Sequence, residues 1–327
     1  MTTEPMTAAL AEAAATAGRA PSVHNTQPWR WRLTGDTLDL YADRSRQLTA
    51  ADPARRLLTI SCGTALHHAR AALAAEGWAA SVEAFPDPAD PDHLARVTLT
   101  GRTDVTPEAM RLVQTIAIRH TDRRPVVDVS VSDEAFEILR QIASREHTGL
   151  HPLRAQDLAE LASAAAQAGE IGLDDPDQRA EMAYWIGGDR PAGTGVPDSA
   201  VPSHPPQTGV PVRDFGHPGT LAVGPGHDRL ATYAILFGRG DDPTDWLQAG
   251  QALSAIWLAA TQLGLAVLPL SSVVEVTVTR ERLRRILSHL NHPYLVLRLG
   301  LADPDQAGAP RTPRLPTEQT IQRPPGR

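Results

Sequence analysis

The chain of 327 residues contains no lysine, a single cysteine and few aromatic residues, 4% in all. Without lysine, Schiff-base catalysis and a P-loop lysine are excluded. One cysteine can form neither a disulfide framework nor a cysteine-only metal cluster. Cys62 stands in an apolar stretch, which favours a small buried core residue over the alternative, a reactive thiol.

Positive charge is also scarce. The 31 basic residues, all arginine, face 38 acidic ones, which gives a formal net charge of −7. Nucleic acid is therefore not expected as a main partner, although a local basic pocket for a small anion is compatible with this balance. Hydrophobic residues make up 42% of the chain, enough for a substantial core. No charged segment followed by an apolar run opens the sequence, so we expect no signal peptide.

One stretch resembles a membrane span, because residues 246–274 carry no charged side chain. Gly264 and Pro269 interrupt it, however, and several glutamines and hydroxyl residues dilute it. A buried helix to about residue 263, followed by a short buried strand at 265–268, fits this pattern better than a bilayer helix. We therefore expect no membrane contact and a soluble, cytoplasmic protein.

Hydrophobic periodicity and turn residues predict an alternation of helices and short strands. Helices are expected at about 6–17, 53–76, 107–118, 132–145, 155–171, 176–186, 246–263 and 280–290. Strands are expected at 29–33, 37–41, 79–85, 94–100, 231–237, 265–268 and 294–299. Residues 187–219 are rich in proline and glycine, which is typical of a lid or a disordered linker. A Pro/Arg-rich arm follows from about residue 303.

The two parts of the chain resemble each other at a constant offset. The matching residues are Gly63, Ala65, Leu66, Ala72, Gly77 and Ala79 with Gly250, Ala252, Leu253, Ala259, Gly264 and Ala266. A chance alignment of alanine-rich helices is the alternative. The shared glycines and strand order favour a duplication, with two related α+β halves at about 1–104 and 105–327.

The first motif that could carry chemistry is the segment Pro21-Ser22-Val23-His24-Asn25-Thr26-Gln27-Pro28-Trp29. Its prolines hold the backbone extended at both ends. Between them Ser22, Asn25 and Gln27 offer donors and acceptors to a planar heterocycle. The alternative is an Asn/Pro loop that leads into a strand, with Trp29 in the core.

The second motif is Arg119-His120-Thr121-Asp122-Arg123. In an extended segment alternate residues share a side, so two guanidinium groups and a hydroxyl would face one way. Arginine suits a terminal phosphate because it donates bidentately and stays charged. A solvated, salt-bridged surface is the alternative. Two arginines of the C-terminal arm could converge on the same anion: Arg311 and Arg314.

The first motif resembles the Pro-Ser-Ser-x-Asn-x-Gln-Pro-Trp segment of nitroreductases, and Arg119-x-Thr121-x-Arg123 is similar to their Arg-x-Ser-x-Arg phosphate motif. In ordinary nitroreductases the arginine motif comes first, and two subunits share each FMN. Here the order is reversed, as if one chain carried both half-sites. That arrangement resembles the Acg family, actinobacterial nitroreductase-like proteins whose tandem halves form one FMN site under a lid.

The resemblance implies an α+β, nitroreductase-like fold in which two related halves form a pseudo-dimer. It implies that Arg119, Thr121, Arg123 and Arg314 hold the FMN phosphate, and that Ser22, Asn25 and Gln27 contact the ring or the ribityl chain. Ser271 and Ser272 stand where nitroreductases often have Glu-Gly beside the flavin N5. Losing that glycine could crowd a stacked nicotinamide.

These expectations define an FMN-dependent oxidoreductase that takes hydride from NAD(P)H and reduces a nitro compound or a quinone, with the flavin site complete in a monomer. No metal is expected, because the histidines are scattered or adjacent on one helix. A protein that sequesters FMN beneath its lid is the main alternative. A globular protein that has lost the cofactor is the third.

Overall fold

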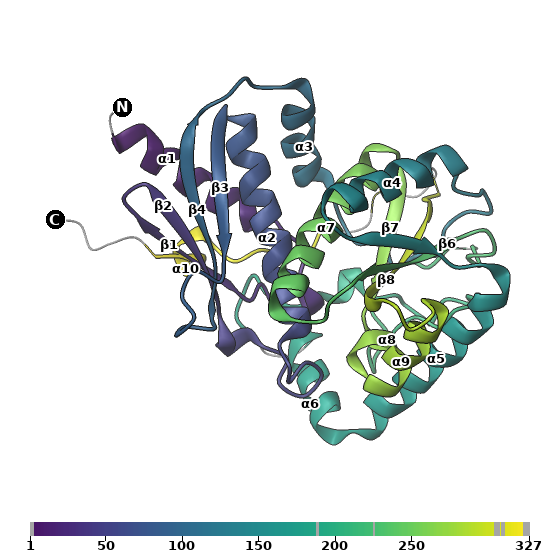
Figure 1. Cartoon of the computed structure of the whole chain (residues 1–327). Coiled ribbons are helices and arrows are strands. Elements are labelled where there is room, and N and C mark those ends of the chain that lie inside the picture. Colours follow the sequence, from purple (N-terminus) through teal and green to yellow (C-terminus); the bar gives the residue numbers. More distant parts are fainter. Residues whose placement is uncertain (1–2, 188–189, 225, 304–307, 309–310, 323–327) are drawn as a thin grey trace.

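The computed structural model describes residues 3–187, 190–224, 226–303, 308 and 311–322 of the chain. The C-terminal arm and the 187–219 segment, both singled out in the sequence, therefore lie partly outside the described residues. The fold is α+β, as the sequence predicts. Figure 1 shows two lobes, each with its own sheet, separated by the helices α2 and α7.

The first lobe contains one five-stranded sheet and the helices that cover it. Its elements are α1 (Thr3–Ala17), β1 (Trp29–Thr34), β2 (Thr37–Ala42), α2 (Arg56–Ala75), β3 (Trp78–Ala84), β4 (His93–Arg102) and α3 (Pro107–Ile118). The second lobe contains a four-stranded sheet. Its elements are α4 (Asp133–Arg145), β5 (Gly149–Pro152), α5 (Ala155–Asp174), α6 (Pro176–Trp185), β6 (Thr232–Gly238), α7 (Pro243–Gln262), β7 (Leu265–Leu270), α8 (Ser272–Glu275), α9 (Thr277–Ile286) and β8 (His292–Leu301).

The C-terminal residues return to the first lobe. After the arm come α10 (Thr317–Thr320) and β9 (Ile321–Gln322), and β9 pairs in parallel with β1 through Trp31 and Ile321. The sequence analysis grouped this arm with the second half, whereas its last strand completes the first sheet. A two-residue edge strand carries too little periodic pattern to be read from the sequence.

Helix starts follow local capping chemistry. The hydroxyls of Thr106 and Ser132 accept hydrogen bonds from the third residue of α3 and α4. Asp242 and Asp245 form a capping box at the start of α7. The helix predicted from residue 53 begins only at Arg56, because Asp52 accepts the Leu58 amide from outside the helix.

Both sheets repeat one topology. The strand orders are β3-β4-β2-β1-β9 and β7-β8-β6-β5, and every pair within these orders is antiparallel except β1 with β9. In each lobe a helix precedes a strand pair, a long buried helix follows, and two further strands close the sheet. The structure thus contains two halves of related topology, and the lobe-specific additions are α3, α5, α6, α8 and α9.

The halves meet where α2 crosses α7. A Cβ on Gly63 would lie 2.1 Å from the Leu247 carbonyl oxygen, and one on Gly250 would lie 2.0 Å from that of Ile60. His67 hydrogen-bonds Ser254 over 2.9 Å. The sequence repeat exchanges the first two contacts, since Gly63 matches Gly250 and Ile60 matches Leu247, and His67 and Ser254 are themselves matching positions. Such reciprocal contacts are those of a two-fold interface, here formed within one chain.

We expect Gly63→Ala to destabilise the protein by about 1–3 kcal/mol, because the new methyl group meets backbone that cannot rotate away. Gly169→Ala in α5 is the matched control. A Cβ there meets nothing within 4 Å, so this variant should gain about 0.5–1 kcal/mol. Urea unfolding of both variants measures the difference. Equal stability of the two would contradict the close crossing of α2 and α7.

The charge-free stretch is a buried helix followed by a strand, as predicted. Between Leu247 and Ala260 every residue of α7 is buried except Gln248. No helix among the described residues is long and apolar enough to cross a membrane. Cys62 is also buried, in the core of the first lobe, so the prediction of a core cysteine is confirmed.

Candidate functional site

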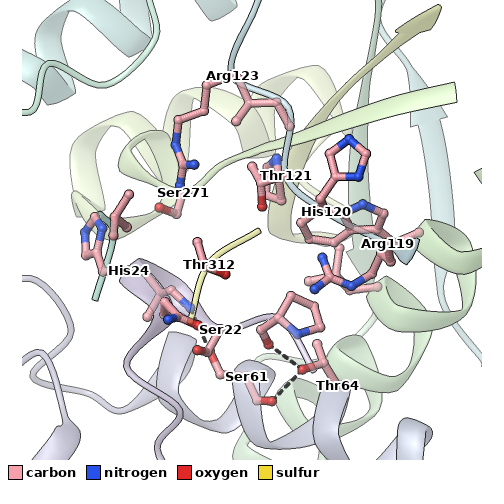
Figure 2. A pocket seen from close by; sticks show the side chains of 18 of the residues that line it. Ser22, His24, Ser61, Thr64, Arg119, His120, Thr121, Arg123, Ser271 and Thr312 are labelled. Carbon is pink, nitrogen blue, oxygen red and sulfur yellow. Dashed lines mark hydrogen bonds between the residues drawn. The ribbon is translucent and has the colours of Figure 1, made fainter. Parts of the chain in front are cut away.

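A cavity of about 360 Å³ lies between the two halves. Its walls come from the loop after α1, from α2 and α7, from the segment after α3, from β7 and α8, and from the 187–219 segment and the C-terminal arm. Figure 2 shows labelled side chains of these elements facing one another across it. Segments far apart in the sequence therefore build one site in one chain. A pocket of this size suits a small organic ligand.

The loop after α1 enters the pocket in a strained conformation. His24, Asn25 and Gln27 have φ values of 46°, 55° and 51°, in the left-handed region that residues other than glycine rarely adopt. The Oγ of Ser22 accepts the Gln27 amide at 2.9 Å, and the Oγ of Ser61 accepts the Val23 amide at 3.2 Å. Such strain persists only where the surroundings hold it, and it concentrates at functional sites.

The structure brings most of the predicted site residues together. Those that line the pocket are Ser22, Asn25, Arg119, Thr121, Arg123, Ser271, Ser272 and Arg314. Gln27 is not among the lining residues. It is fully buried behind the pocket, where its Nε2 donates to the Gly193 carbonyl over 2.7 Å and its Oε1 accepts the Leu315 amide.

Asn25 is likewise engaged by protein. Its Nδ2 donates to the carbonyls of Gly195 (3.0 Å) and Pro313 (2.9 Å), and its Oδ1 accepts from Arg314. The contact of Asn25 and Gln27 with the flavin ring or ribityl chain stays a prediction; their side chains also tie the 187–219 segment and the C-terminal arm to the first lobe. Sequence could not reveal this, because the partners are backbone atoms more than 160 positions away.

Arg119 carries the strongest electrostatic signal in the site. Its side chain is only 6% exposed and stacks over Trp257 at 4.6 Å, yet its Nε and Nη1 have no hydrogen-bond partner among the described residues. Its Nη2 reaches the Arg19 carbonyl over 3.4 Å, an interaction shared by Arg314 at 3.2 Å. Buried donors without acceptors are costly. An anion at this point would satisfy them.

The pKa values reflect the same deficit of negative charge. Burial lowers the pKa of Arg119 to about 9, and the neighbouring Arg314 lowers it further. Burial, with Arg19 nearby, lowers the pKa of Arg314 to about 10. No carboxylate contributes to the lowered pKa of Arg119 or of Arg314. The donors of Arg119 and Arg314 therefore fit a phosphate group.

Arg123 does not share this end of the pocket. Figure 2 shows its guanidinium beside Ser271, on the far side of Thr121 from Arg119. It donates to the Ala200 carbonyl over 3.2 Å and lies over the Phe215 ring. The two arginines of the second motif, Arg119 and Arg123, thus point toward different ends of the site. The alternation of side chains along an extended segment predicted Arg119 and Arg123 on one side of it. It cannot predict how far apart the two guanidinium groups lie along a cavity.

The described part of the 187–219 segment forms a wall of the pocket. Its residues Val196, Pro202, Val212 and Phe215 line the cavity. Arg213 donates to the Oγ of Ser271 over 3.2 Å and forms a short ion pair with Glu275. Burial alone would raise the pKa of Glu275, but Arg213 holds it below its ordinary value.

Several lining residues were missed in the sequence. They are Arg19, His24, Ser61, Thr64, His120, Arg213, Phe215 and Trp257. Arg19 and His24 flank or belong to the first motif, so their position was a usable signal. His120 belongs to the second motif, which was a signal of the same kind. The others stand in helices (Ser61, Thr64, Trp257) or in the proline-rich segment (Arg213, Phe215), and only folding brings them to the cavity. Among the described residues no cluster of three or more His, Cys, Asp or Glu could hold a metal ion.

No protein-family model matches the chain. The Mycobacterium tuberculosis (strain H37Rv) protein named "Putative NAD(P)H nitroreductase Rv3131" is 35% identical over 312 residues, which cover 94% of this chain and 89% of the relative. From the same organism, "Putative NAD(P)H nitroreductase acg" is 32% identical over 306 residues, covering 93% of this chain and 92% of the relative. The chain therefore belongs to the nitroreductase family, in its Acg-type branch.

Among solved structures, the FMN- and NADPH-dependent nitroreductase NfnB of a Sphingopyxis strain aligns with 64% of this chain and 97% of its own, at 17% identity and a TM-score of 0.40. A nitroreductase with bound FMN from Bacteroides fragilis aligns with 62% of this chain and 93% of its own, at 12% identity and a TM-score of 0.39. Family membership rests on the sequence relatives and not on these weak structural likenesses.

Proposed function

We propose that the protein is an FMN-dependent NAD(P)H oxidoreductase that reduces a small acceptor, such as a nitro compound or a quinone. The observation that carries the proposal is Arg119, whose buried Nε and Nη1 lack acceptors at one end of a cavity between the two halves. The names of the relatives, NAD(P)H nitroreductases, support the reaction class. The phosphate of FMN supplies the missing acceptor.

In this proposal Arg119 and Arg314 bind the phosphate, and Trp257 packs beneath the Arg119 guanidinium. The first motif and the segment from Thr121 to Arg123 form the walls along the rest of the cofactor. When bound, FMN supplies the redox chemistry, accepting two electrons as hydride and passing them to the acceptor. The residues of the chain bind, orient and exclude water.

The site draws on both halves of one chain, so we propose that it is complete in a monomer. We also propose the division into halves at residues 1–104 and 105–327, with the repeated topology as support for an internal duplication. The C-terminal arm then serves both halves. Its Arg314 faces the pocket, while its last strand joins the first sheet.

The test is an absorbance spectrum of the purified protein, followed by anaerobic titration with NADPH and with NADH. A flavin band that bleaches within seconds supports the oxidoreductase. Failure to bind FMN after reconstitution would overturn the proposal, together with the assignment of Arg119.

A second candidate is a protein that sequesters FMN without turnover. The contacts that hold the 187–219 segment over the pocket favour it, since they are made by protein groups alone: Asn25, Gln27 and Arg213. A bound flavin that stays oxidised under excess NADPH and NADH, yet is reduced by dithionite, would identify this function.

We propose that the 187–219 segment is a lid and that the Arg213–Glu275 ion pair latches it. Arg213→Met removes the latch and leaves Glu275 buried without its partner, so FMN should dissociate at least about tenfold faster. The release of FMN into excess apoflavodoxin, followed by fluorescence, measures the rate. Asp214→Asn, at the exposed neighbouring position, is the matched control. An unchanged rate in Arg213→Met would contradict the lid.

A further inference from the structure

The side chain of His24 has no role in the contacts described above. Figure 2 shows its imidazole at the pocket end of Ser271 and Arg123, away from Arg119. Among the described residues it makes no hydrogen bond through either ring nitrogen, although its neighbour Asn25 makes three through its side chain. An unpartnered imidazole inside a cavity is a group prepared for a ligand.

The backbone of the loop fixes where this imidazole lies. His24 adopts φ 46° and ψ 23°, and the turns around it are closed by the amides of Asn25 and Thr26, which donate to the carbonyls of Ser22 and Val23. The carbonyl of Asn25 in turn accepts the Gly195 amide. The strained conformation is thus held from both sides, and it directs the side chain into the pocket.

Three other polar side chains at this end each make at least one contact with protein. Arg213 is paired with Glu275, and the Oγ of Ser271 accepts from Arg213. Arg123 donates to the Ala200 carbonyl and lies over Phe215. His24 therefore differs from these three neighbours, because neither of its ring nitrogens has a protein partner among the described residues.

His24 is neutral in this setting. Burial lowers its pKa to about 3, with Arg213 and Arg123 acting in the same direction and Glu275 against them. A neutral imidazole has one N–H donor and one acceptor nitrogen. Three residues of the 187–219 segment that line the same pocket, Val196, Val212 and Phe215, are apolar. The combination suits a flat, uncharged molecule with one polar edge.

We propose that His24 determines acceptor specificity, donating a hydrogen bond to the carbonyl or nitro oxygen of a small, uncharged, planar electron acceptor that packs against Phe215. This rests on the proposed oxidoreductase function and names the substrate class of the same site. Anionic acceptors are not selected, because the neutral ring offers no charge.

The experiment compares wild-type protein with His24→Phe and His24→Gln, all full-length and loaded with FMN. The probes are 1,4-naphthoquinone, which carries carbonyl oxygens, and ferricyanide, which takes electrons without a hydrogen bond. For His24→Phe, kcat/KM for naphthoquinone should fall about tenfold, mainly through KM, the effect of one lost hydrogen bond. His24→Gln should recover most of this loss. Ferricyanide reduction should fall much less than naphthoquinone reduction, because it needs no hydrogen bond from His24.

Binding provides a readout that does not depend on turnover. The Kd of naphthoquinone for the oxidised protein, from quenching of flavin fluorescence, should rise about tenfold in His24→Phe and much less in His24→Gln. Should His24→Phe fail to fold, His24→Ala takes its place in both measurements. Equal naphthoquinone affinity in wild type and the loss variant would overturn the proposal, as would an equal loss toward ferricyanide.

The two proposals fail differently. If wild-type flavin is not reduced by NADPH or NADH, the oxidoreductase function is wrong, while the naphthoquinone Kd still decides the role of His24. If the flavin bleaches normally and the His24 variants bind naphthoquinone like wild type, only the inference about His24 is wrong.

Discussion

Replacing Arg119 with alanine is expected to abolish retention of FMN during purification. The variant loses the two donors, Nε and Nη1, that have no other partner among the described residues. A hydrogen bond to a charged group contributes roughly 1.5–3 kcal/mol. We therefore expect a loss of about 3 kcal/mol, a factor of about 100 or more in Kd.

The comparison needs variants that separate this contact from a general loss of positive charge. Arg314→Ala removes the second arginine at the same end and should weaken FMN binding to a similar degree. Arg111→Ala is the matched control, because Arg111 lies on the exposed face of α3 and pairs with Glu108. Its Kd should equal that of the wild type. Fluorescence titration of apoprotein with FMN gives all four values.

A further discrimination uses riboflavin, which lacks the phosphate. Wild-type protein should prefer FMN to riboflavin strongly, and Arg119→Ala should lose most of that preference. If Arg119→Ala weakens both ligands equally, its side chain does not contact the phosphate, and the electrostatic assignment of this end of the pocket is wrong.

Acid should destabilise the protein steeply below pH 6.5 because three histidines are held neutral in the folded state. Burial, with Arg213 next in effect, lowers the pKa of His24 to about 3. Burial, with Arg70, lowers that of His67 to about 3. Burial, with Arg119, lowers the pKa of His68 well below its ordinary value.

The direction follows from proton linkage. Each histidine has a lower pKa folded than unfolded, so the unfolded chain binds the extra proton as the pH falls below 6.5. Stability is therefore complete above that value and is lost progressively toward pH 3. Between pH 7 and pH 5 each of the three histidines costs about 2 kcal/mol, about 6 kcal/mol in all. That approaches the entire stability of a typical domain.

His68 offers the cleanest variant. It is fully buried, and both of its ring nitrogens lack partners among the described residues. His68→Leu should leave stability at pH 7 nearly unchanged or improved, and reduce the loss between pH 7 and pH 5 by about a third. His204→Gln, at an exposed position, is the control. Urea midpoints of the flavin-free proteins at several pH values test this, and identical pH slopes for wild type and His68→Leu would refute it.

Most of the fold could be read from the sequence because its signals are local. The hairpin of β1 and β2 is set by alternating residues around Thr34-Gly35-Asp36, and α3 begins at a proline behind a capping threonine. The sequence did not predict the short elements. β5 has only four residues, and α8 only four, too few for a period to show.

The site was predicted less completely than the fold. Residues of both motifs line the cavity, and Arg119 is one of them. The roles of Asn25 and Gln27 could not be read, because an amide is equally able to hydrogen-bond a ligand or a distant backbone. The ion pair between Arg213 and Glu275 joins positions 62 residues apart, and no local pattern marks it.

The sequence by itself indicated the α+β fold, the family and the two segments that line the pocket, since these depend on composition, periodicity and short motifs. Only the tertiary structure decided which arginines lie at the same end of the pocket. Arg119 meets Arg314 from the far end of the chain, while Arg123, four positions away, faces the opposite end of the pocket. The physical reason is that a charge acts through distance in space, which the crossing of α2 and α7 and the return of the C-terminal arm set.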